Sequence, residues 1–70
     1  MRGDEFMRRV RRLGCRDRVE ARLDSRHGKG SHARLYYGDR RTTIPDLRRE
    51  LKTGLLHGMC KDLGIDPNEL

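Results

Sequence analysis

The sequence HARLYYGDRRTTI, residues 32–44, decides the fold because it contains two strand-like runs separated by a tight turn. Ala33, Leu35 and Tyr37 alternate with polar or charged residues, which is the pattern of a strand with one covered face. Gly38-Asp39 is typical of a hairpin turn, and the Thr-Thr-Ile run that follows favours extended backbone. We therefore predict two antiparallel strands joined at this turn.

A third strand is predicted upstream, where Val19, Ala21 and Leu23 alternate with charged side chains. The three strands would form a meander with one apolar face. In the strand after His32, the side chains at alternate positions, namely His32, Arg34 and Tyr36, fall on the opposite, polar face.

Amphipathic helices are expected on both sides of the strands. Apolar residues recur at helical spacing from Asp4 to Leu13, with Asp4 as the expected N-cap and Gly14 as the expected stop. A second helix is expected to follow Thr53 as its N-cap and to end at Gly64. The order α-β-β-β-α predicts an α+β fold of two layers, with both helices on one face of the sheet.

Composition indicates a small basic domain spanning residues 1–70. Seventeen Lys and Arg against 11 Asp and Glu give a formal net charge of +6. Most of the cations are arginines, whose planar fork matches phosphate, which favours nucleic acid or an acidic protein as partner. A basic surface of a thermostable protein or of a high-GC-encoded one is the other interpretation. The arginines of the first helix likewise suit either a solvated face or phosphate contacts: Arg8, Arg9, Arg11 and Arg12.

The two cysteines, Cys15 and Cys60, are far apart and form no CxxC pair, so we expect both to be buried free thiols. No apolar run is long enough to span a membrane, and the first residues lack a hydrophobic signal region. We therefore expect a cytoplasmic protein with reduced cysteines.

Three kinds of active site do not fit the residues around His32. Consecutive strand residues point to opposite faces, so Ser31 and His32 could not form a nucleophile–base pair. The segment Gly28-Lys29-Gly30-Ser31 lacks the Walker spacing and precedes a strand rather than a helix. No histidine spacing is a recognised metal-ligand motif, and we expect neither a metal nor a cofactor.

The chemistry that remains is metal-independent cleavage of RNA. A general base, here His32, would take the proton from a ribose 2′-hydroxyl, and cations would stabilise the charge developing on phosphorus. Lys29, Arg34 or Tyr36 could orient the phosphate or assist the leaving group. The alternative is that His32 only forms a hydrogen bond at the end of a strand.

Four short segments together resemble the HicA toxins of bacterial and archaeal toxin–antitoxin systems: Lys29-Gly30-Ser31-His32 with the aromatic pair that follows, Thr43-Ile44-Pro45, Glu50–Leu56 and Lys61–Ile65. Their order extends over nearly the whole chain. The sequence departs from the family at Leu47 and Leu55, where histidine and threonine are usual.

The resemblance implies a fold similar to double-stranded-RNA-binding domains, cleavage of mRNA, and neutralisation by a HicB-like antitoxin. It also implies that His32 is catalytic and that Gly30 and Ser31 shape its loop. RNA-binding residues are then expected at Lys29, Gly30, Ser31, Arg34 and Tyr36. Two other functions stay open on the sequence: a non-catalytic RNA-binding module, and a basic adaptor for an acidic protein partner.

Overall fold

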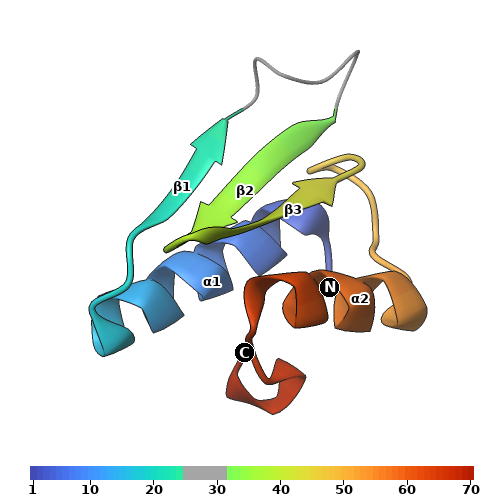
Figure 1. The fold of residues 1–70 in the computed structure, drawn as a ribbon. Coiled ribbons are helices and arrows are strands. Elements are labelled where there is room, and N and C mark those ends of the chain that lie inside the picture. Colours follow the sequence, from blue (N-terminus) through green and yellow to red (C-terminus); the bar gives the residue numbers. More distant parts are fainter. Residues whose placement is uncertain (25–31) are drawn as a thin grey trace.

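The computed structural model of this chain describes residues 1–24 and 32–70. The predicted order α-β-β-β-α is confirmed (Figure 1), and a short 3₁₀ helix follows it. The elements are α1 (Gly3–Asp17), β1 (Ala21–Asp24), β2 (Ala33–Tyr37), β3 (Arg40–Ile44), α2 (Thr53–Leu63) and η1 (Pro67–Glu69). The segment Gly28-Lys29-Gly30-Ser31, singled out in the sequence, lies outside the described residues.

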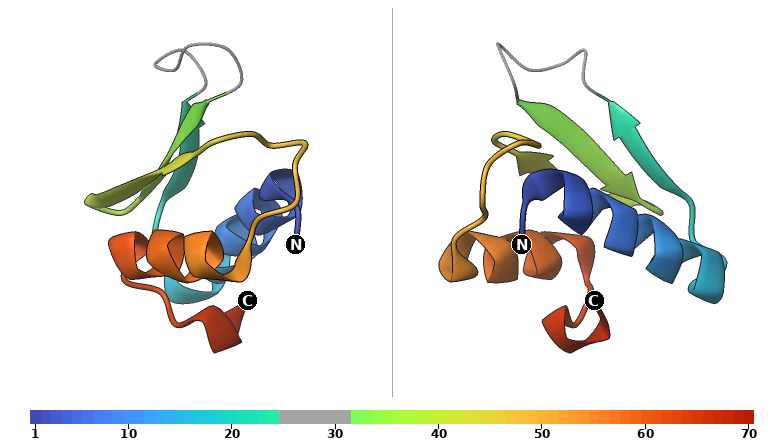
Figure 2. Two further views of the ribbon diagram at one scale, coloured as in Figure 1. Left: turned by 90° about the vertical axis from the view of Figure 1, so that its right-hand side faces the viewer. Right: turned by 180° about the vertical axis from the view of Figure 1, so that it is seen from behind.

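The three strands form one antiparallel sheet in the order β1-β2-β3. Leu35 of β2 lies opposite Leu23 of β1 and Thr42 of β3, so these side chains share one face of the sheet. Both helices lie on that face, as Figure 2 shows from two sides, and together with the sheet they make the two predicted layers. This is the α+β arrangement of double-stranded-RNA-binding domains.

The core lies between the sheet and the two helices. Phe6 and Val10 of α1, Leu35 of β2 and Ile44 of β3 have no exposed surface, and Met59 of α2 is 2% exposed. The alternating pattern that predicted β2 is confirmed, since Ala33, Leu35 and Tyr37 are buried. Burying side chains of this size contributes about 1.5–3 kcal/mol each, so the apolar face of the sheet fixes the position of both helices.

Helix α1 begins differently from the expectation that Asp4 is its N-cap. The cap position is Arg2, and its side chain makes no capping hydrogen bond. Instead, backbone N–H groups at the helix start donate to carbonyls of the loop before α2, from Gly3 to Arg49 O (3.1 Å) and from Asp4 to Leu47 O (2.8 Å). These distant carbonyls accept hydrogen bonds that a capping side chain would otherwise accept. No local sequence pattern indicates such distant partners.

Helix α1 also continues past Gly14, which the sequence indicated as its end. The helix ends about one turn later at Asp17. Its C-cap, Arg18, is in the left-handed conformation (φ 59°), and the Arg18 N–H donates to Gly14 O. Gly14 is needed for a different reason: a Cβ there would lie 2.5 Å from the carbonyl oxygen of Val19. The glycine allows the chain leaving the helix to pass close to it on the way to β1.

Helix α2 has the expected end and nearly the expected start. It ends at Gly64, which is left-handed (φ 71°), as predicted. Thr53 is its first helical residue rather than its N-cap, which is Lys52. Within residues 1–24 and 32–70, no helix has the length and apolar character needed to cross a membrane.

The two cysteines are both free thiols, but they differ in exposure. Cys60 is fully buried, as predicted, and burial raises the pKa of its thiol. Cys15 is exposed, so the expectation that it is buried was wrong. The extension of α1 past Gly14 explains the difference, because position 15 then falls on the solvent side of the helix.

We predict opposite effects on stability for two Gly→Ala substitutions in helices. Gly14→Ala should lower the free energy of unfolding by about 1–3 kcal/mol, because the added methyl group meets backbone that cannot move aside easily. Gly58→Ala in α2 is the matched control, since a Cβ there meets nothing within 4 Å. It should raise the free energy of unfolding by about 1 kcal/mol through helix propensity. Urea denaturation measures both, and equal effects would contradict the close approach at Gly14.

Candidate nucleic-acid interface

The sheet face turned away from the helices carries charged and polar side chains in two rows. The antiparallel register aligns the rows across the strands as Arg22–Tyr36–Arg41 and Asp24–Arg34–Thr43. Three of these six side chains are guanidinium groups and one is a carboxylate. The outer face of the sheet is therefore a basic surface, as phosphate contacts require.

Tyr36 lies at the centre of the first row, on the middle strand. The guanidinium carbon of Arg22 is 4.7 Å from the centroid of the Tyr36 ring, which is a cation–π contact. The contact holds a flat aromatic ring and a planar cation together on the outer face, with the ring half-buried. Both kinds of group stack on nucleic-acid bases, so this pair can hold a base while neighbouring arginines hold phosphates.

His32 lies immediately before β2, and its side chain is exposed. The residue that follows it, Ala33, is 2% exposed and faces the core, so the chain enters the sheet directly after the histidine. The imidazole is thus outside the apolar layer between sheet and helices. A histidine in this position is accessible to a substrate that lies along the outer face.

The predicted RNA-binding residues divide into two groups. Arg34 and Tyr36 lie on the outer face of β2, on the side predicted for them. Lys29, Gly30 and Ser31 lie outside the described residues.

The sequence interpretation missed Arg22 and Arg41, which flank Tyr36 across the sheet. Alternation alone already placed Arg22 on the polar side of its strand. The two-residue turn at Gly38-Asp39 also fixes the register of that hairpin, so it could have placed Arg41 opposite Tyr36. What the sequence could not give was the register between β1 and β2, since the number of residues in their connection does not fix which residues face each other.

The interior offers no second site in the part of the chain that the structure describes. Thr42 is its only buried polar residue, and its hydroxyl donates to a carboxylate oxygen of Asp62 at 3.0 Å. Every buried side-chain nitrogen or oxygen among these residues has a hydrogen-bond partner. Residues 1–24 and 32–70 also contain no group of three or more His, Cys, Asp or Glu placed to hold a metal ion.

Comparison with known protein families gives one match. Residues 3–65 match the family described as the HicA toxin of bacterial toxin-antitoxin. The chain belongs to the HicA toxin family. The matched region extends from the start of α1 to the residue after Gly64, so it includes all three strands and both long helices. No curated protein and no solved structure matches this HicA chain.

The family match confirms the resemblance found in the sequence. HicA proteins are toxins of toxin–antitoxin systems that cleave mRNA, and the basic outer sheet face of this member is consistent with RNA binding. The match does not assign a role to any single residue.

We predict that Arg22 and Tyr36 are energetically coupled. In a double-mutant cycle of Arg22→Gln and Tyr36→Leu, the coupling free energy should be about 0.5–1 kcal/mol, the usual size of an exposed cation–π pair. Arg41→Gln is the control, because Arg41 also lies opposite Tyr36 but on the other neighbouring strand. Chemical denaturation of the single and double variants gives both values. A coupling of Arg41 as large as that of Arg22 would contradict a specific contact.

Proposed function

We propose that this HicA toxin is a metal-independent endoribonuclease in which His32 is the general acid or base. The observation that carries the proposal is the exposed position of His32 at the start of β2, next to the basic outer face of the sheet. A transcript bound along that face reaches the imidazole without any rearrangement of the core.

The reaction needs only groups that RNA and a small basic protein supply. His32 accepts the proton of a ribose 2′-hydroxyl, the 2′-oxygen attacks the adjacent phosphorus, and the bond from phosphorus to the 5′-oxygen breaks. The products are a 2′,3′-cyclic phosphate and a 5′-hydroxyl, with the proton ending on the leaving oxygen. One positioned histidine contributes typically about 100- to 10,000-fold in rate.

The remaining roles belong to cations and to the stacking pair. Arg34, two positions after His32 along the chain, is on the outer face and can stabilise negative charge on the phosphate. Tyr36 together with Arg22 binds a base of the RNA by stacking, which fixes the position of the RNA along the outer sheet face. Lys29 supplies a further cation in this proposal, and Gly30 and Ser31, which precede His32 in the sequence, are proposed to contact the RNA.

A HicB-like antitoxin is the proposed protein partner. An RNA-cleaving toxin must be kept inactive in its host, and an acidic partner placed on the outer sheet face would compete with RNA for the same arginines. Binding there would also cover His32. The partner and the substrate would thus exclude each other through one surface.

We predict that His32→Ala abolishes RNA cleavage measured in the presence of a chelator, with a loss of about 100- to 10,000-fold. His57→Ala is the matched control, because His57 is also an exposed histidine but lies on α2. It should cleave like the wild type. A substrate with a 2′-deoxy sugar at the cleaved position should be resistant, since it lacks the nucleophile.

Three outcomes would contradict the proposal. Cleavage that survives His32→Ala would assign the chemistry to another group, and cleavage that stops on adding a chelator to the wild type would make the reaction metal-dependent. RNA binding without any cleavage by the wild type would favour a non-catalytic RNA-binding module.

A further inference from the structure

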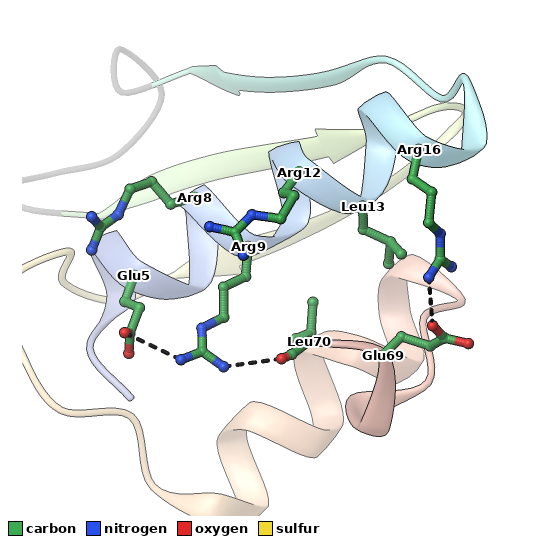
Figure 3. Close-up of a pocket in the computed structure, with 8 residues that line it drawn as sticks. All are labelled: Glu5, Arg8, Arg9, Arg12, Leu13, Arg16, Glu69 and Leu70. Carbon is green, nitrogen blue, oxygen red and sulfur yellow. Dashed lines mark hydrogen bonds and ion pairs between the residues drawn. The ribbon is translucent and has the colours of Figure 1, made fainter.

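A groove lined by arginines lies on the helical layer of the molecule, between α1 and the segment around η1 (Figure 3). Its volume is about 390 Å³. None of its lining residues belongs to a strand, so the groove is separate from the outer face of the sheet. Its lining residues are Glu5, Arg8, Arg9, Arg12, Leu13, Arg16, Glu69 and Leu70.

Two of the four arginines are held in place by acceptors from both sides of the groove. Arg9 donates to the backbone oxygen of Leu70 at 2.9 Å and lies 3.3 Å from a carboxylate oxygen of Glu5. Arg16 donates to a carboxylate oxygen of Glu69 at 2.9 Å. These contacts tie α1 to the chain after α2 and fix the two walls of the groove.

The other two arginines, Arg8 and Arg12, have no ion pair or hydrogen bond from their side chains to any residue in the ranges 1–24 and 32–70. They are one helical turn apart on the same side of α1, and both are exposed. Like charges at this spacing repel each other, and the two carboxylates of the groove are already engaged by Arg9 and Arg16. The groove therefore has two guanidinium groups available for an anion from outside the chain.

We propose that this groove is a second RNA contact, in which Arg8 and Arg12 bind successive phosphates of the substrate backbone. The proposal rests on RNA being the substrate, as proposed above. It gives the toxin two basic surfaces, one on the sheet where cleavage occurs and one on the helices where a more distant part of the same RNA is held.

The chemistry of the groove favours a nucleic-acid backbone over an acidic protein segment. Protein interfaces have an apolar centre, but the apolar side chains here are Leu13, which is only 6% exposed, and Leu70. Protein–nucleic-acid interfaces are more polar and more positive. The guanidinium fork binds phosphate oxygens in pairs, and a row of arginines on one helix side matches the regular charge spacing of a backbone.

The test measures binding of a 16-nucleotide single-stranded RNA with 2′-O-methyl groups throughout, which the proposed chemistry cannot cleave. Binding constants are determined between 50 and 200 mM KCl for the wild type and for Arg8→Gln/Arg12→Gln. The plot of log K against log salt should become shallower by about 1.4 in the double variant, since each lost phosphate contact on a single strand contributes about 0.7.

The matched control is Arg11→Gln/Arg48→Gln, which removes the same charge from exposed arginines outside the groove. In this control, the slope of log K against log salt should change by less than half as much as in the groove variant. With a cleavable RNA of the same length, the groove variant should show a KM raised roughly fivefold to tenfold at an unchanged kcat, because Arg8 and Arg12 are proposed to bind the RNA backbone and not the reacting atoms.

Each outcome decides between the proposals. One result is that the two double variants show equal slopes of log K against log salt while the wild type binds and cleaves RNA. That result would overturn the proposed RNA contact in the groove and leave the proposed function standing. A wild type that neither binds nor cleaves RNA would overturn both. A groove variant that loses binding of a poly-glutamate 16-mer but keeps the slope for RNA would assign the groove to an acidic protein instead.

Discussion

Phe6, Leu35 and Ile44 have no exposed surface because both helices pack against the same face of the three-stranded sheet. Among residues 1–24 and 32–70, no helix or strand forms a third layer over the other face. That face is left to polar and charged side chains, and the alternation of strand residues aims them away from the core. The position of the candidate site is thus a consequence of how the core is built.

The pattern of apolar residues was sufficient to predict the two layers, the hairpin at Gly38-Asp39 and the polar side of β2. These features depend on local periodicity and turn chemistry. The two ends of α1 were not predictable in the same way. At its start, the backbone donors find their acceptors at Leu47 and Arg49, which are distant in sequence; at its end, Gly14 serves a close approach to Val19 rather than a helix stop. Contacts between distant segments leave no local signal.

For the candidate site, alternation within a strand predicted which side chains lie on the outer face of that strand. Arg34 and Tyr36 followed from alternation along β2, and the two-residue turn at Gly38-Asp39 could have placed Arg41 opposite Tyr36, whereas Arg22 required the register between β1 and β2. The role of the arginines of α1 could not be predicted from the sequence either. Their spacing was compatible both with a solvated face and with phosphate binding, and the contacts to Glu5 and Glu69 then distinguished paired from unpaired guanidinium groups.

The distribution of charge gives a physical account of how so small a protein binds a polyanion. In the account proposed here, the net charge of +6 attracts RNA from a distance, while the outer sheet face and the groove beside α1 hold it. In the same account, substrate specificity depends on the proposed base contacts at Tyr36 more than on the charge itself.

The central claim, that RNA lies along the outer sheet face beside His32, is tested most directly by nuclear magnetic resonance. Uncleavable 2′-O-methyl RNA is titrated into isotope-labelled protein, and the shifts of backbone amides and of the His32 ring are followed. The account predicts the largest changes at His32, Arg34, Tyr36 and Arg22. Unchanged signals at these four positions, with RNA bound elsewhere on the molecule, would contradict it.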